Sequence, residues 1–359
     1  MRTMPAIPGV TNWVRQKLKR PNCLELAKLP TDINKISLHL ERQIEGADSG
    51  EAYIIRQPVM GRGMFSLVSS VVCHLHVAQR FNLNPVVDFS ASYLTEYNDS
   101  EFEEQDEQHR TNAWDYYFQP VSTLTLEEAV GYKRILSSVR SFPDRYPVTI
   151  SHVRELRKLT RKMIHPCPEI AKVVDMIWQE SFKGNQVLGV QYRGQEQKTM
   201  PYHPLSPTTE QLHTAIDLAI QQHGFNQIFA VSEDADNIAS IQARYGSMVI
   251  TLPHFRTHAP VNAYRIKPRK MHKYLLGREI LTDALLLSRC QGLVSGPSTV
   301  NEFSRSLNDE QYLIDLVIDN GFNATNKTAA KHLWNIKAKL PEEWGGFSNR
   351  AIKPFPIDH

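Results

Sequence analysis

The second half of the chain alternates strand-like and helix-like segments, a pattern that few folds allow. Short, largely apolar runs predict strands at 187–192, 228–231, 248–252, 292–295 and 311–318. Apolar residues at helical spacing, together with capping signals, predict helices at 168–182, 208–222, 235–245, 273–289 and 299–307. Because strands alternating with helices form parallel sheets covered on both faces, we expect a doubly wound α/β domain.

The first half contains one shorter unit of the same kind. Residues 52–55 predict a strand, 60–64 a glycine turn, 65–81 a helix and 86–89 a second buried strand. This order is a βαβ unit. Residues 90–112 are rich in acidic side chains and predict a surface insertion.

Pro166 and Pro168 interrupt the chain between the two halves. We therefore expect two Rossmann-like domains, an N-terminal one at 1–165 and a C-terminal one at 166–359. The second includes a C-terminal tail that could cross back onto the first. Two such domains would face a central cleft, with a ligand between the carboxyl ends of their sheets.

Composition excludes several classes of protein. Lys and Arg number 41 against 38 for Asp and Glu, so nucleic acid is not an expected partner. The four cysteines form no C-x-x-C pair, which argues against a zinc site and favours a reducing compartment. No apolar run reaches the ~18 residues of a membrane span, and the first twenty residues lack the apolar core of a signal peptide. We expect a cytoplasmic protein. A basic segment at 15–20 could touch anionic membrane, although a solvated helix face is the commoner fate of such a segment.

The strongest local signal is the end of the strand at 187–192. Arg193 follows this buried strand, and Gly194 allows the chain to turn away. At the carboxyl edge of an open α/β sheet such an arginine points into the ligand crevice. A guanidinium there can bind a diphosphate through two hydrogen bonds. The alternative is an ordinary surface arginine at a strand end.

A second signal is the loop of small residues after the strand at 292–295. Ser298 and Thr299 open the next helix, where backbone N–H groups and hydroxyls can bind phosphate oxygens. Either residue could instead simply cap the helix, and the two roles are compatible.

Two further patterns are weaker. The turn at 60–64 contains Gly61, Arg62 and Gly63 but is not a G-x-G-x-x-G, so a dinucleotide cofactor is poorly supported. Asp234 and Asp236 form a D-x-D, which could hold a divalent cation. Carboxylates at a helix N-terminus are the commoner explanation of that pattern.

Several segments together resemble the α1,6/O-fucosyltransferase superfamily, including its nodulation fucosyltransferases. Residues 189–194 (GVQYRG) are similar to its first motif, and 202–204 to the aromatic-His-Pro that follows it. Residues 229–234 (FAVSED) resemble the second motif and 283–299 the third. The glycine turn and the segments at 86–88 and 112–118 resemble parts of the first domain. The resemblance covers about 60–320 in patches and is more specific in the C-terminal half.

This resemblance implies a GT-B fold, with an acceptor-side N-terminal domain and a donor-binding C-terminal domain. It implies metal-independent, inverting transfer of fucose from GDP-fucose to a glycan acceptor, with no cofactor. The acceptor could be a lipid-linked oligosaccharide. Asp283 would bind the guanine and Arg193 the β-phosphate. The remaining residues expected around the donor are Gly61, Arg62, Gly63, Gln191, Ser298 and Thr299.

The departures from the family pattern leave alternatives open. Gln191 replaces the usual histidine, and a glutamine can donate or accept when it contacts a base or ribose. Glu196 and Gln197 replace the usual Asp-Lys pair, so Glu196 is the carboxylate expected to act as general base, ahead of Asp115. The alternatives are a different nucleotide sugar, or a sugar-nucleotide-binding protein that has lost catalysis. Aromatic residues at 114, 116 and 117 could stack on the acceptor or pack in the core.

Overall fold

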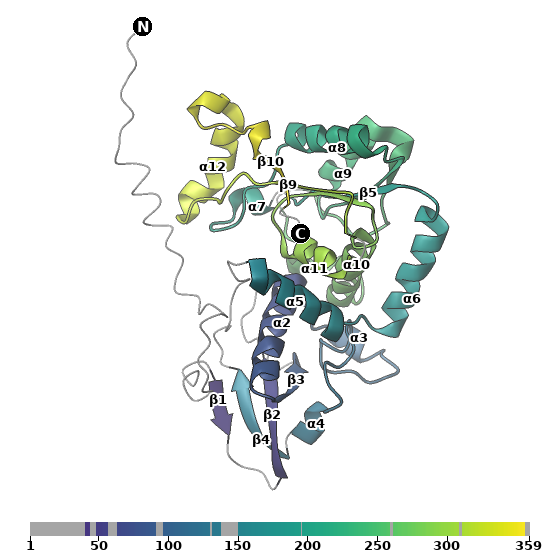
Figure 1. Ribbon diagram of the computed structural model, residues 1–359, viewed down its shortest axis with the longest axis vertical. Coiled ribbons are helices and arrows are strands. Elements are labelled where there is room, and N and C mark those ends of the chain that lie inside the picture. The colour runs from purple at the N-terminus through teal and green to yellow at the C-terminus, as the bar shows by residue number, and fades with distance from the viewer. Residues whose placement is uncertain are drawn as a thin grey trace.

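The computed structural model describes residues 40–43, 48–56, 63–90, 96–129, 131–137, 150–194, 196–258, 261–308 and 311–355. Gly61, Arg62 and the basic segment at 15–20 lie outside these residues. The described chain builds two sheets, one from each half of the sequence, with helices between and around them (Figure 1).

The larger sheet belongs to the C-terminal half and has the order β10-β9-β8-β5-β6-β7 among the described residues. Its parallel strands are β5 (Val187–Gln191), β6 (Gln227–Val231), β7 (Val249–Ile250), β8 (Gly292–Ser295) and β9 (Ile314–Ile318). All five were predicted from the sequence, and this parallel arrangement is confirmed. The C-terminal tail adds an antiparallel strand, β10 (Ile352–Pro354), at the edge beside β9.

The strand order contains a reversal, which predicts where a ligand crevice would lie. From β5 the chain proceeds to β6 and β7 on one side, then crosses to β8 and β9 on the other. In open α/β sheets a crevice forms at the carboxyl ends of the two strands flanking such a reversal. Here those strands are β5 and β8, which pair in parallel with Gln191 opposite Ser295.

The helices of this half are α6 (Pro168–Ile177) with a π-helical turn at Trp178–Phe182, α7 (Glu196–Thr199), α8 (Thr209–His223), α9 (Ala235–Tyr245), α10 (His272–Leu287), α11 (Thr299–Leu307) and α12 (Lys327–Lys339). Five of them, α6, α8, α9, α10 and α11, have the predicted order, whereas α7 and α12 were not predicted from the sequence. The capping box of Thr208 and Gln211 opens α8, and Gly224 ends it with a left-handed φ of 67°. These terminal signals were local enough to be recognised in the sequence.

The smaller sheet has the order β1-β4-β2-β3. Its strands are β1 (Leu40–Gln43), β2 (Asp48–Arg56), β3 (Asn84–Asp88) and β4 (Tyr132–Ser137). The predicted βαβ unit is confirmed, because β2 and β3 are parallel and α2 (Met64–Arg80) connects them. The sequence analysis missed β4, which is parallel to β2, and β1, which is antiparallel to β4.

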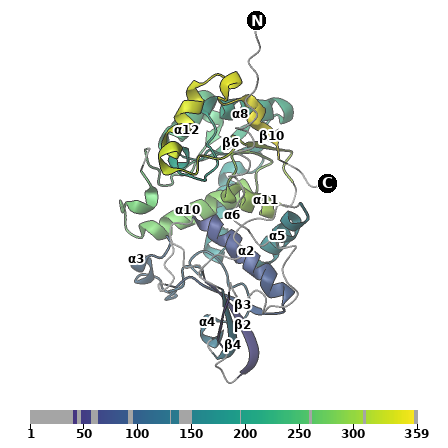
Figure 2. The same ribbon diagram turned by 90° about the vertical axis from the view of Figure 1, so that its left-hand side faces the viewer.

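A layer of helices joins the two sheets. Helices α2, α5 (Ile150–Met163), α10 and α11 lie between them in both views (Figures 1 and 2). The ring of Phe65 on α2 lies 4.6 Å from that of Phe303 on α11, centroid to centroid. Both rings belong to one apolar cluster that also includes Tyr53 of the smaller sheet and Leu293 of the larger. The two halves therefore share a continuous core.

The acidic segment before residue 112 is not simply a surface insertion, and that prediction is wrong for residues 99–103. Asp99 precedes α3 (Ser100–Glu103) and accepts a hydrogen bond from the backbone N–H of Tyr274, and Glu101 accepts one from Met271. Phe102 is buried and stacks on Tyr274 at 3.8 Å. Both carboxylates thus lie at the positive N-terminus of α10, where the helix dipole favours them.

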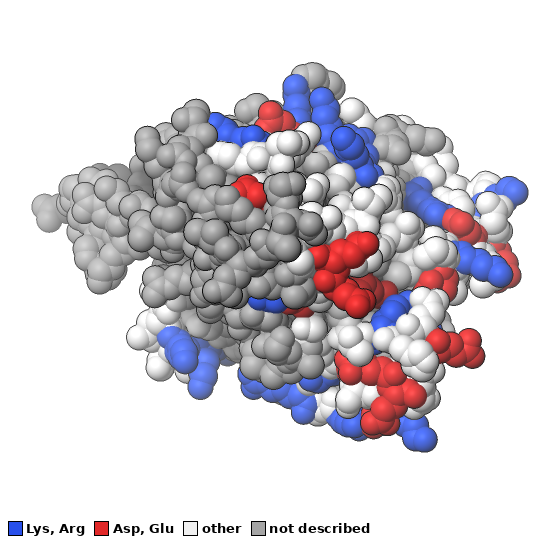
Figure 3. All heavy atoms as spheres, turned by 90° about the horizontal axis from the view of Figure 1, so that it is seen from below, with Lys and Arg blue, Asp and Glu red and all other residues white. Residues whose placement is uncertain are grey.

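The surface of the smaller domain carries mixed charge. In the view from below, the described atoms include both Lys and Arg and Asp and Glu side chains (Figure 3). A short helix, α4 (Leu126–Ala129), has Glu127 and Glu128 in its first turn. Within the described ranges, no helix combines the length and the apolar character needed to span a bilayer.

Candidate functional site

The crevice between β5 and β8 brings together the two strongest sequence signals. Arg193 follows β5 and Ser298 follows β8, and an Arg193 Nη1 lies 3.4 Å from the Ser298 hydroxyl. The two residues are far apart in the sequence, and the parallel pairing of β5 with β8 brings them together. A cationic side chain and a helix N-terminus consequently share one edge of the sheet, the arrangement that binds phosphates in many α/β proteins.

The backbone around Arg193 is held by the loop that follows β6. The Arg193 carbonyl accepts a hydrogen bond from Nδ2 of buried Asn237 at 3.2 Å. The Gly194 N–H donates to Oε1 of Glu233 at 3.2 Å. A Cβ at residue 194 would lie 3.0 Å from the Glu233 side chain. Glycine at this position therefore allows the Glu233 carboxylate to lie close to the backbone. Glu233 and Asn237 fix the path of the chain on either side of the guanidinium.

Ser298 is the N-cap of α11, and its hydroxyl accepts from the Val300 N–H at 3.3 Å. Thr299 is the first residue of the helix, and both side chains are half-buried. The capping role that the sequence left open is confirmed for Ser298. It is compatible with a ligand at the same place, because a hydroxyl that accepts from the backbone can donate to an anion.

The N-terminal half covers this edge with a tyrosine that the sequence analysis did not single out. The Tyr97 hydroxyl accepts from the Met64 N–H, the first residue of α2, at 2.6 Å. It also lies 2.6 Å from the hydroxyl of Tyr264 in the C-terminal half. Burial raises the pKa of Tyr97 to about 12, while the Arg193 charge acts in the opposite direction. Tyr97 therefore joins the start of α2, next to Gly63, to the Arg193 side of the crevice.

Asp283 lies on α10 and faces the loop after β7. Its Oδ1 is 3.1 Å from Nδ1 of His254, although the contact falls outside hydrogen-bond geometry. Both side chains are about 15% exposed, so the carboxylate is accessible to a ligand from one side. Arg256 lies in the same loop, where burial lowers its pKa and the Asp283 charge raises it. No direct contact joins Asp283 to Gln191 or Arg193 among the interactions of the described residues.

The predicted general base and glycine loop are only partly described. The backbone of Glu196 begins α7, three residues after Arg193, and its side chain lies outside the described atoms, like Gly61 and Arg62. The alternative base, Asp115, is half-buried, and burial raises its pKa to about 6 against the opposing effects of Asn112 and Arg110.

The aromatic wall expected to stack on an acceptor is part of the core. Trp114, Tyr116 and Tyr117 are between 0 and 2% exposed. Tyr117 packs against Tyr97 and Tyr274, and Trp114 against Phe118. Core packing, the second interpretation offered by the sequence, is the one that the structure supports, because all three rings are buried.

The D-x-D pattern occupies the start of α9. Asp234 is the N-cap and accepts from the Asp236 N–H at 2.9 Å, whereas Asp236 is 64% exposed and contacts His258. Over the described ranges, His, Cys, Asp and Glu side chains form no group of three or more that could hold a metal ion. The capping role that the sequence offered for this pattern is confirmed for Asp234.

The fold and the site together define a two-sheet α/β protein in which Arg193 lies beside the N-terminus of α11 at the reversal of the larger sheet. The chain is similar to the solved structure of the fucosyltransferase NodZ from Bradyrhizobium, with 17% identity, TM-score 0.48, and coverage of 76% of this chain and 97% of NodZ. A second NodZ structure, an α1,6-fucosyltransferase soaked with GDP-fucose, has 17% identity, TM-score 0.47 and coverage of 75% and 94%.

The chain is also similar to the structure of POFUT1 in complex with GDP, with 13% identity, TM-score 0.45, and coverage of 76% of this chain and 99% of POFUT1. No protein-family model matches the chain, and no curated protein matches it.

Proposed function

We propose that this protein is a GT-B glycosyltransferase that transfers fucose from GDP-fucose to a glycan acceptor, with inversion and without a metal ion. One observation supports the proposal more than any other. Arg193 and the N-terminus of α11 meet at the reversal between β5 and β8, within reach of one bound diphosphate. The motifs around Arg193, Asp283 and Ser298 resemble those of enzymes with this activity.

The reaction follows from the charges that the crevice offers. The acceptor oxygen attacks C1 of the sugar, and the bond from C1 to the β-phosphate oxygen breaks, so that GDP leaves with increased negative charge. Arg193 and the N–H groups at the start of α11 stabilise that charge, as fixed donors do for developing anions. The proton of the acceptor hydroxyl passes to a carboxylate, for which we propose Glu196.

The proposal is tested by supplying the chain with sugar nucleotides and following nucleotide release. The panel consists of GDP-fucose, GDP-mannose, UDP-glucose and dTDP-rhamnose, each with and without glycan acceptors. GDP release from GDP-fucose above the rate without enzyme, and incorporation of fucose into an acceptor, are the expected results. If every donor stays intact although GDP binds, the chain is a binding protein rather than an enzyme.

Guanine selectivity is a separate prediction that depends on Asp283. A carboxylate can accept from N1–H and the N2 amino group of guanine together, whereas uracil and thymine offer one N–H on that edge. An unsatisfied buried acceptor costs ~1–3 kcal/mol, or about 5- to 150-fold in affinity. We expect GDP to bind better than UDP or dTDP by such a factor, and Asp283→Asn to remove most of the preference, as measured by competition binding.

A matched control for this prediction is Asp217→Asn, an exposed carboxylate that pairs with Arg244 on the protein surface. It changes the net charge equally but should leave the preference intact. Tighter binding of UDP or dTDP by tenfold or more would show that Asp283 does not bind guanine.

Metal independence is tested by chelation. Asp234 is engaged as a helix cap, and Asp236 is exposed beside His258. We therefore expect transfer to continue at an unchanged rate in excess EDTA and in the Asp236→Ala variant. Loss of activity in EDTA that Mn²⁺ restores would instead assign the D-x-D pair to a metal-bound diphosphate.

A further inference from the structure

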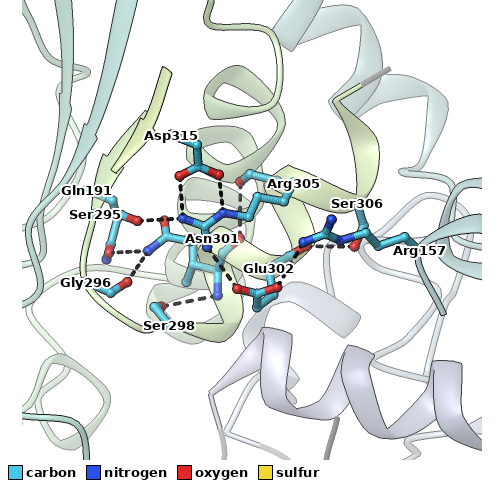
Figure 4. A network of polar contacts seen from close by, with 12 residues as sticks. Arg157, Gln191, Ser295, Gly296, Ser298, Asn301, Glu302, Arg305, Ser306 and Asp315 are labelled. Carbon is cyan, nitrogen blue, oxygen red and sulfur yellow. Dashed lines mark hydrogen bonds and ion pairs between the residues drawn. The ribbon is translucent and has the colours of Figure 1, made fainter. Parts of the chain in front are cut away.

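Asn301 is a buried residue that the sequence motifs did not single out. It lies in the first turn of α11 and is 0% exposed. Its Nδ2 donates to the Gly296 carbonyl at 2.9 Å and to Oε1 of Gln191 at 3.0 Å (Figure 4). One amide group thus joins the loop after β8 to the last residue of β5, at the two strand ends that flank the crevice.

The backbone fixes the orientation of this amide. A carbonyl oxygen such as that of Gly296 can only accept, so Asn301 must turn its NH₂ group toward it. The opposite orientation would place Oδ1 against that carbonyl oxygen, and both atoms can only accept. The orientation seen leaves Oδ1 buried without a hydrogen-bond partner among the described residues.

The orientation of the Asn301 amide in turn fixes the orientation of the Gln191 amide. Gln191 is 4% exposed. Its Oε1 accepts from Asn301, so the atom that it can offer to a ligand is Nε2, which only donates. The sequence alone left open whether this glutamine donates or accepts. Gly296, Asn301 and Gln191 together decide the question through two consecutive hydrogen bonds.

We propose that Asn301 is a positioning residue that holds Gln191 as a hydrogen-bond donor toward an acceptor atom on the base or ribose of a bound nucleoside diphosphate. This inference rests on the proposed function, since it assumes that the crevice between β5 and β8 binds a nucleotide. A histidine in place of Gln191 would have the same polarity, because one ring nitrogen would accept from Asn301 and the other would donate. A glutamate would present a carboxylate oxygen instead.

The test measures the affinity of GDP and of inorganic pyrophosphate by isothermal titration calorimetry. We expect Asn301→Ala and Gln191→Ala each to weaken the affinity for GDP about 3- to 10-fold, which is the effect of losing one ordered hydrogen bond. The double variant should be no weaker than the more affected single variant, since the two residues act through one contact. Pyrophosphate, which has neither base nor ribose, should bind within twofold of the unsubstituted chain throughout.

Isosteric substitutions test the polarity itself. Asn301→Asp should weaken GDP more than Asn301→Ala does, because the carboxylate draws Gln191 Nε2 away from the ligand. Gln191→Glu should weaken the affinity for GDP tenfold or more. The Gln191→His variant should bind GDP with an affinity within about threefold of that of the unsubstituted chain. If Asn301→Ala does not fold, the two Gln191 substitutions provide the same polarity test in a chain that keeps Asn301.

The matched control is Asn308→Ala, at the other end of α11. Asn308 Nδ2 donates to the Ser288 carbonyl at 2.8 Å, and its Oδ1 is also buried without a partner, but it does not contact the crevice. GDP affinity should not change in this variant.

Three results would overturn the inference. GDP affinity unchanged in Asn301→Ala would show that Gln191 needs no positioning. If Asn301→Ala weakened the binding of GDP and of pyrophosphate equally, Asn301 would only support the loop between β8 and α11. An unsubstituted chain that binds pyrophosphate but no nucleotide would overturn both this inference and the proposed function, whereas the first two results leave the proposed function standing.

Discussion

Replacement of Arg193 by alanine is expected to lower the rate of sugar transfer at least 100-fold while the chain stays folded. Removal of one preorganised donor to a developing anion costs about 10²- to 10³-fold in rate. Arg193 is half-buried and follows β5 rather than lying inside the sheet, so we expect the chain to fold without its side chain. The measurements are initial rates with saturating donor and a thermal melt of the same sample.

Arg193→Lys should fail nearly as completely. A lysine keeps the charge but cannot form two parallel hydrogen bonds to a diphosphate. Arg244→Ala is the control, because Arg244 is 49% exposed and pairs with Asp217 on the surface. Retention of more than half of the rate in Arg193→Ala would remove Arg193 from the proposed mechanism.

Disruption of the buried pair formed by Arg305 and Asp315 should destabilise the protein by about 3–5 kcal/mol. Nε and Nη2 of Arg305 donate to the two carboxylate oxygens at 2.6 and 2.8 Å, and both side chains are at most 5% exposed. Burial alone would lower the pKa of Arg305, but the hydrogen bonds to Asp315 raise it above its ordinary value. Arg305→Met would therefore leave an uncompensated carboxylate in the core. Urea unfolding measures the loss.

The same guanidinium also connects the core to the candidate site. It donates to Ser295 at the end of β8 and to Glu302 on α11 (Figure 4). It also lies over the ring of Phe355, 4.0 Å from the ring centroid. Phe355 also lies 5.3 Å from the guanidinium of Arg157 on α5, so the C-terminal tail contacts a residue within 1–165, the range that the sequence analysis assigned to the first domain. The helix itself was not predicted from the sequence.

A double-mutant cycle separates the ion pair from simple packing. Arg305→Met combined with Asp315→Leu should recover much of the stability lost in either single variant, because no buried charge remains. Arg244→Ala, at an exposed ion pair, should cost no more than about 1 kcal/mol. Loss of less than 1 kcal/mol in Arg305→Met would show that solvent reaches Asp315 in the folded protein.

The sequence by itself determined the order of β5 to β9 and of α6, α8, α9, α10 and α11, because periodicity and capping are local. The capping box at Thr208, the glycine that ends α8 and the short apolar runs of β5 to β9 each depend on residues within a few positions. It also placed Arg193 and Ser298 at strand ends, since the end of an apolar run is visible in the chain.

Only the tertiary structure decided which of those strand ends meet. The pairing of β5 with β8 brings Arg193 to Ser298 and Gln191 to Asn301, contacts 105 and 110 residues apart in sequence. Tyr97 and the acidic residues at 99 and 101 acquired their roles only through contacts with the other half of the chain. The aromatic cluster at 114–117 fits a binding wall or a core equally well in sequence, because both need large apolar side chains. Burial, which depends on every neighbouring element at once, placed it in the core.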